Sequence, residues 1–93
     1  MTEISKLYGK MVITKDAFTV GEITGAEMND DWWITHIEVK LTKEAAKELG
    51  LKKPYLGNVS VCLPVIYVRS IGDVITLSRN RHELKKMPEC KID

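Results

Sequence analysis

Apolar and polar side chains alternate most regularly over Trp32–Leu41. Successive side chains of a strand point to opposite faces. One face of this predicted strand is nearly all apolar and holds Trp33, Thr35, Ile37, Val39 and Leu41. The other begins apolar and ends charged, with Trp32, Ile34, His36, Glu38 and Lys40. We expect the first face to pack in the core and the second to face solvent, so that Trp32 and Ile34 form an outer apolar patch.

Two strands are predicted before this one, over Lys10–Thr14 and Phe18–Asn29, with a turn between them. Alternation fails across Gly21, because Val20 and Ile23 are three residues apart and both have the character of core residues. A one-residue bulge would return them to one face, and an isolated glycine in a strand often marks such a bulge. Long, bent strands of this kind close small barrels.

After Leu41 the pattern changes to that of a helix over residues 42–50. Thr42 can cap its first turn, Ala45 and Leu49 share one face, and Gly50 can end it in the left-handed conformation. A helix of about two turns is not stable alone in water. We therefore expect it to pack over one end of a barrel.

Three short strands are then predicted, over Val59–Leu63, Val65–Val68 and Val74–Leu77. Pro64 indicates a corner or an edge, because proline has no N–H to donate to a ladder. A helical turn after Ser78 would be held by its apolar residues Leu84 and Met87. Short strands separated by turns favour a barrel or sandwich. The pattern predicts a mainly β domain over residues 1–93, with its barrel core at about 8–78 and a C-terminal extension at 79–93.

The chain has 93 residues, of which 44% are hydrophobic and 29% charged, and its net charge is +1. This length suits one core, and this charge argues against a general binder of nucleic acid or of membrane surfaces. We expect a cytoplasmic protein, because the sequence has no bilayer-length apolar run and no secretory signal at its start. Cys62 and Cys90 are too few for the disulfide framework of a small secreted domain. We expect Cys62 to pack as a reduced, small apolar residue and Cys90 to be an exposed thiol.

The sequence offers no arrangement typical of catalysis. It lacks a glycine-rich phosphate loop, a nucleophile elbow and a pair of carboxylates with catalytic spacing. Its cysteines and histidines do not have the spacing of a zinc site. His36 is expected to be solvated and Asp73 to cap a turn. We therefore expect no enzyme activity, no cofactor, and no catalytic, cofactor-binding or metal residues.

Three side chains are candidates for a partner or dimer interface: Trp32, Ile34 and Tyr67. An outward Trp beside an apolar neighbour is typical of an interface anchor. The alternative is that Trp32 folds over an edge of the barrel. Tyr67 would face outward if Ile66 and Val68 face inward.

The C-terminal segment contains a local excess of basic residues, which are Arg79, Arg81, Lys85 and Lys86. Such a cluster can contact an acidic partner or RNA. The segment has no interleaved aromatic residues for stacking bases, which favours the alternative of a solvated helical turn.

The order of several short motifs resembles that of the PRC-barrel family. These motifs are Tyr8-Gly9-Lys10-Met11-Val12, Val20-Gly21-Glu22-Ile23, the strand ending at Val39, Leu63-Pro64, and Ile71-Gly72-Asp73-Val74-Ile75-Thr76-Leu77. The resemblance covers most of the chain and is strongest to the short, stand-alone archaeal members, which carry a helix at the place of residues 42–50. It departs from the family at Asp16-Ala17, where a glycine is common in the first hairpin.

The resemblance implies a small, closed or partly open β-barrel of about six strands that binds other proteins and has no active site. Some members form homodimers. Archaeal stand-alone members resemble cell-division adaptors that bind SepF, the anchor of FtsZ, and a more distant relative is the C-terminal domain of the ribosome-maturation factor RimM. We therefore expect a non-catalytic adaptor that forms a homodimer and binds a protein partner such as a SepF-like division protein. The alternative is an accessory module of RNA metabolism or ribosome maturation.

Overall fold

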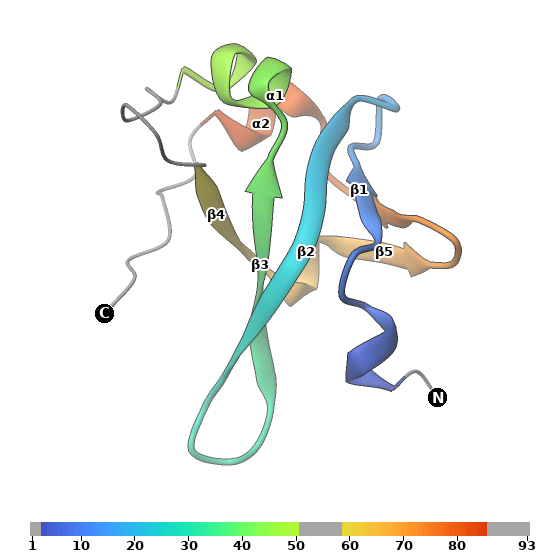
Figure 1. The fold of residues 1–93 in the computed structure, drawn as a ribbon, viewed down its shortest axis with the longest axis vertical. Helices are drawn as coiled ribbons and strands as arrows, with labels where there is room; N and C mark the ends of the chain where they lie inside the picture. The colour runs from blue at the N-terminus through green and yellow to red at the C-terminus, as the bar shows by residue number, and fades with distance from the viewer. Residues whose placement is uncertain (1–2, 51–58, 86–93) are drawn as a thin grey trace.

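The computed structural model describes residues 3–50 and 59–85. Within them, one β-sheet is accompanied by two short α-helices and two 3-10 helices (Figure 1). In chain order the elements are η1 (Ile4–Lys6), β1 (Met11–Ile13), β2 (Thr19–Met28), β3 (Ile34–Leu41), α1 (Lys43–Glu48), β4 (Ser60–Pro64), η2 (Val65–Tyr67), β5 (Val68–Ile71), β6 (Ile75–Leu77) and α2 (Arg81–Leu84).

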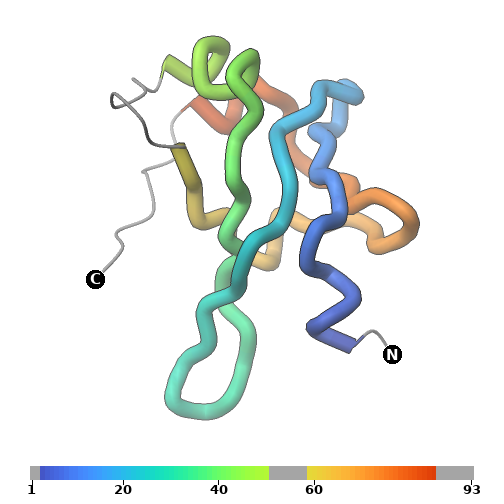
Figure 2. The backbone as a smooth tube through the Cα atoms, viewed as in Figure 1, coloured from blue at the N-terminus to red at the C-terminus, as the bar shows by residue number. Residues whose placement is uncertain are grey.

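The six strands lie in the order β4-β3-β2-β1-β6-β5. Neighbours are antiparallel except for β1 and β6, which are parallel. The mainly β fold with six strands is thus confirmed. Since β4 and β5 stand at opposite ends of this order, the part of the chain that the structure describes forms an open sheet, and barrel closure stays a prediction. Figure 2 shows that the β2–β3 hairpin extends well beyond the rest of the sheet.

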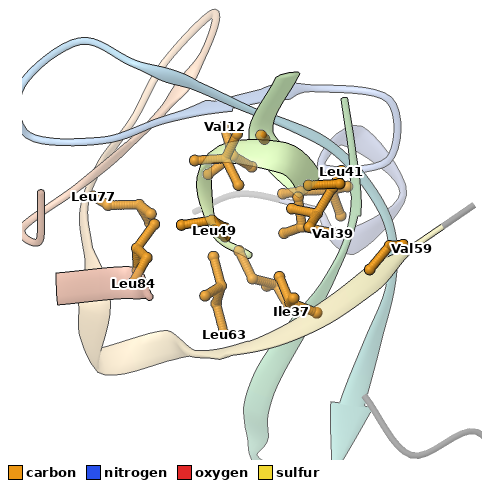
Figure 3. Packing of buried hydrophobic residues seen from close by; sticks show 14 of the residues in the cluster. Val12, Ile37, Val39, Leu41, Leu49, Val59, Leu63, Leu77 and Leu84 are labelled. Atoms are coloured by element: carbon orange, nitrogen blue, oxygen red, sulfur yellow. The ribbon is translucent and has the colours of Figure 1, made fainter. Parts of the chain in front are cut away.

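The core is built from alternate residues of the strands and from the two helices (Figure 3). On β3, Ile37, Val39 and Leu41 are buried, as the alternation predicts. Trp33 was expected on the same face, but it is 71% exposed. The alternation therefore holds for the second half of Trp32–Leu41 and fails for the first.

The bulge expected near Gly21 is present. Gly21 pairs with Val12 and Thr19 with Ile13, so Val20 has no partner in β1. Both Val20 and Ile23 are buried as a result. A Cβ atom on Gly21 would lie 2.0 Å from the carbonyl oxygen of Lys40, so only glycine allows β2 and β3 to approach this closely.

Both expected helical segments are present. In α1, the side chain of Thr42 accepts a hydrogen bond from the Ala45 N–H (3.0 Å), and Gly50 follows with a φ of +74°. Asn80 and Glu83 cap α2 reciprocally, and Leu84 is only 2% exposed. Both helices lie at the same end of the sheet in Figure 1, opposite the tip of the β2–β3 hairpin.

The segment after β4 differs from the expectation. A strand was predicted over Val65–Val68, but Val65–Tyr67 is the 3-10 helix η2 and the strand begins at Val68. The orientation predicted from strand alternation is therefore reversed, because a 3-10 helix has three residues per turn. Ile66 is 78% exposed, and Tyr67 is partly buried against the core.

Cys62 is partly buried and disulfide-bonded, so the expectation of a reduced thiol is wrong. Lys86, Met87 and Cys90, to which the sequence also assigns roles, lie outside the described residues. In the described ranges, no helix is long and apolar enough to cross a membrane.

Candidate functional site

The tip of the β2–β3 hairpin is a loop organised by Asn29. Its side-chain oxygen accepts hydrogen bonds from the backbone N–H groups of Asp31 and Trp33, each at 3.0 Å. Its carbonyl oxygen accepts a third bond from the Trp32 N–H at 3.1 Å, and its own N–H donates to the carbonyl of Trp33. Short polar side chains often stabilise turns in this way. The loop therefore has a defined shape although it projects into solvent.

Trp32 occupies the least usual backbone conformation of this loop. Its φ is +67°, in the left-handed region that non-glycine residues rarely adopt. Its side chain is 84% exposed, as expected from the outward position given to it by the sequence. Strained residues of this kind concentrate at functional sites. The loop backbone thus presents a large aromatic ring to water.

A second bulge lies in β3 at Thr35. Met28 pairs with Ile34 and Glu27 with His36, so Thr35 has no partner in β2. The extra residue reverses the alternation at this point. Ile34 was expected on the outer face with Trp32, but it is partly buried and lies on the side of Ile37.

Trp32 and Ile34 border an open, apolar depression of about 890 Å³, which we call the apolar groove. Its described lining residues are all apolar, and they come from separate elements along the chain: Leu7, Ile23, Trp32, Trp33, Ile34, Ile37, Val65, Val68, Ile71 and Ile75. Ile23, Ile37 and Ile75 are buried core residues that form its floor. Trp32, Trp33 and Ile71 are exposed and form its rim.

The composition of the apolar groove decides what it can do. Among the described residues, no charged, hydroxyl or imidazole side chain lines it, so this lining offers no nucleophile, acid or base. Over residues 3–50 and 59–85, no group of three or more His, Cys, Asp or Glu side chains could hold a metal ion. Ligand pockets usually add a few polar groups that orient the ligand. This groove instead favours burial of another apolar surface.

The hairpin tip also carries two carboxylates. Asp30 and Asp31 precede Trp32 directly and are exposed. Among the described residues, neither side chain forms a salt bridge or a hydrogen bond. The apolar rim at Trp32 is therefore flanked by uncompensated negative charge.

Tyr67 does not belong to this site. It is absent from the groove lining, and its ring packs against the core on one side. The guanidinium of Arg79 covers the ring at 4.8 Å from its centroid. The structure thus brings together Trp32 and Ile34 of the three predicted interface residues, and it places Tyr67 elsewhere.

The basic cluster is engaged within the chain. Arg79 forms an ion pair with Glu83 (3.2 Å), and Arg81 forms one with Asp16 (3.4 Å). The guanidinium of Arg81 also lies over the ring of Phe18, 5.3 Å from its centroid. Lys85 is exposed. Both arginines therefore anchor α2 to neighbouring parts of the fold.

Two carboxylates respond to these contacts. A hydrogen bond from the Thr14 hydroxyl, backed by the Arg81 N–H and guanidinium, lowers the pKa of Asp16 below its ordinary value. The Asn80 N–H and the Arg79 guanidinium lower the pKa of Glu83 in the same direction. Hydrogen bonds to a charged form favour that form. The ionised forms of both carboxylates thus stabilise α2.

Reasoning from the sequence missed several residues of the groove: Leu7, Trp33, Val65, Val68 and Ile71. One signal for Trp33 was present, because two adjacent tryptophans directly follow a polar turn. The other four come from η1, η2 and β5 or their ends, and no local pattern relates them. A scan against models of protein families finds no match to this chain, and a search among curated proteins finds none.

Proposed function

We propose that this protein is a non-catalytic interaction module of the PRC-barrel type, which uses the apolar groove to bind a protein. The observation that carries this proposal is the exposure of Trp32 and Trp33 on the rim of a depression whose described lining residues are all apolar. A Trp side chain buries about 150–250 Å² on contact, and Trp is among the most common anchors of interfaces. A rim so exposed is therefore suited to a partner that covers it.

The biological role in the proposal comes from the family resemblance. It is that of an adaptor which forms a homodimer and binds a division protein such as a SepF-like partner in an archaeal cytoplasm. The resemblance rests on the sequence motifs, and the six-stranded, mainly β sheet is compatible with it. A closed barrel, formed by contact between the two end strands, is part of the same proposal.

The alternative is an accessory module of RNA metabolism or ribosome maturation, with the basic cluster as its contact. To bind phosphates, Arg79 and Arg81 would have to leave their ion pairs within the chain, although their side chains are 45% and 49% exposed. Arginines that bind phosphates need their guanidinium groups accessible. Lys85 is exposed as well, and Lys86 lies outside the described residues.

Affinity purification from a lysate of the native cells, with and without nuclease, tests the proposal. Trp32→Ser should remove the bound proteins, whereas Ile66→Ser should retain them. Ile66 is the matched control, because it is an exposed apolar residue outside the groove lining. Circular dichroism should show both variants folded, since both side chains are largely exposed.

The outcomes separate the two functions. Proteins that survive nuclease and depend on Trp32 support the interaction module. Ribosomal proteins that are lost with nuclease and remain bound to Trp32→Ser support the alternative. Sedimentation equilibrium of the purified protein measures the expected homodimer independently.

A further inference from the structure

Charge at the hairpin tip indicates the chemistry of the partner. Asp30 and Asp31 lie next to the exposed ring of Trp32, and the described structure gives their carboxylates no cation. A partner that covers the rim must approach these two charges. Complementary charge at the edge of an interface favours the right partner and disfavours others.

We propose that the apolar groove takes an amphipathic, positively charged segment of another protein, an inference that rests on the interaction function proposed above. Apolar side chains of the segment lie against the accessible part of the lining, which includes the half-buried Ile34 and Val68 and the exposed Ile71. Its Lys or Arg side chains pair with Asp30 and Asp31. An amphipathic helix in an apolar groove is a common recognition mode.

The exposed tryptophans strengthen the preference for a cationic partner. Ammonium and guanidinium groups are attracted to the face of an aromatic ring, and Trp is the best acceptor. Trp32 presents its ring to solvent beside two carboxylates, so one Lys or Arg side chain could contact the ring and a carboxylate together. An acidic segment would meet only repulsion there.

A second copy of this chain fits the tip less well. In a two-fold symmetric dimer the same patch meets itself. Contact centred on the hairpin tip would bring Asp30 and Asp31 of both copies together, and like charges at an interface are unfavourable. Of the three arginines of the chain, Arg79 and Arg81 already pair within it, which leaves the exposed Arg69 of each copy to neutralise the four carboxylates of the dimer.

A lipid surface fits less well for the same reason. Segments that lie in a membrane interface combine apolar or aromatic residues with Lys and Arg, which attract anionic lipids. This tip combines its aromatic residues with carboxylates. Its charge therefore opposes an anionic bilayer.

Intrinsic fluorescence can test the proposal directly. The chain contains two tryptophans, and both lie on the rim of the groove. A shift of their emission to shorter wavelength therefore reports that the rim has been covered. The probes are three helical peptides of about 18 residues, which share one leucine face and carry Lys, Gln or Glu on the other.

We expect the Lys peptide to bind about five- to tenfold more tightly than the Gln peptide, as two exposed ion pairs would provide. The Glu peptide should bind most weakly. The combined variant Asp30→Asn and Asp31→Asn should remove the preference while binding of the Gln peptide persists. Salt at about 0.5 M should have the same effect, because it screens exposed charges.

Three results would overturn the proposal. The first is equal binding of the Lys, Gln and Glu peptides. The second is self-association that shifts the emission without peptide and that Trp32→Ser abolishes, which would make a second copy the occupant. The third is that vesicles of phosphatidylcholine and phosphatidylserine shift the emission, whereas none of the three peptides does.

These results are distinct from failure of the interaction function itself. If peptides bind without regard to charge and Trp32→Ser abolishes binding, the groove still binds proteins and only the charge preference is wrong. If native partners bind Trp32→Ser, Ile66→Ser and the unaltered protein equally, the groove has no role in interaction, and both proposals fall.

Discussion

At the scale of single residues, Trp32 combines two unfavourable features. Its backbone is in the left-handed region and its side chain is 84% exposed. An L-residue in this conformation costs roughly 1–2 kcal/mol. The left-handed backbone belongs to the turn that Asn29 closes, where such a residue commonly ends a short hairpin loop. The exposure of the ring has no counterpart in the packing of the chain, and a partner that covers it would explain it. A site that favours binding at the expense of stability is a common compromise.

Replacing Trp32 should separate stability from binding. Asn adopts the left-handed conformation more readily than most residues. We therefore expect Trp32→Asn to raise the free energy of unfolding by up to about 1 kcal/mol and to abolish partner binding. Urea unfolding and the peptide titration measure the two effects.

Trp32→Ser is the matched control, because it removes the ring without favouring the left-handed region. It should lose binding with no gain in stability. A loss of more than about 1 kcal/mol in both variants would show that the ring packs within the fold, since exposed substitutions usually change stability by less.

At the scale of elements, bulges determine which side chains face the groove, and two of them bear on the sequence predictions. One lies at Val20 in β2 and the other at Thr35 in β3. A bulge bends a strand and re-aims the side chains next to it. The first was foreseeable from Gly21 and the spacing of Val20 and Ile23. The second lies in the pattern Ile34-Thr35-His36, which has no glycine, so the regular alternation hid it.

Gly21 provides a sharp test of the strand geometry. We expect Gly21→Ala to destabilise the fold by about 1–3 kcal/mol, because its Cβ would lie 2.0 Å from the backbone oxygen of Lys40. Gly25→Ala is the control in the same strand, since its Cβ would meet only ordinary contacts from 3.6 Å upward. Thermal unfolding of both variants gives the comparison. Similar stability of the two would contradict the close approach of β2 and β3 at Gly21.

At the scale of the whole molecule, α2 closes the end of the sheet opposite the hairpin tip (Figure 1). Leu84 packs in the core. The carboxylate of Asp16 accepts a hydrogen bond from the Arg81 N–H, and that of Glu83 accepts one from the Asn80 N–H. Segments of the chain far apart in sequence meet here, as the ion pair between Asp16 and Arg81 shows. The basic C-terminal segment thus contributes to the fold up to Lys85, where the described residues end.

The anchoring of α2 should depend on pH. The ordinary pKa values of Asp16 and Glu83 are 3.8 and 4.5, and both are lowered in the folded protein. A lowered pKa gives stability that is complete above the ordinary value and is lost as the pH falls through the lowered one. The free energy of unfolding should therefore fall below a pH of about 4.5.

Urea unfolding between neutral and acidic pH measures this loss. The combined variant Asp16→Asn and Glu83→Gln should be less stable at neutral pH and should show a weaker dependence below it. The matched control is Asp30→Asn with Asp31→Asn, which should retain the acid dependence of the unaltered protein. Identical pH profiles for the unaltered protein and the Asp16–Glu83 variant would show that these carboxylates do not anchor α2.

The sequence alone determined the features that depend on neighbouring residues. The helical period and the caps at Thr42 and Gly50 located α1, and alternation identified the buried face of β3 from Ile37 onward. It also gave six strands in nearly correct places, apart from the strand predicted at Val65. These signals are local, because a cap or a strand face involves residues a few positions apart.

Only the tertiary structure decided the rest. The bulge at Thr35 depends on how β3 pairs with β2, and it places Ile34 inside and Trp33 outside. The apolar groove joins residues from the N-terminal segment, the hairpin and β5, so no stretch of sequence contains it. From the sequence, Arg79 and Arg81 belong to a local basic cluster. The fold places Arg79 over the ring of Tyr67 and pairs Arg81 with Asp16. Contacts between distant segments are fixed by packing, which the pattern of a single segment does not encode.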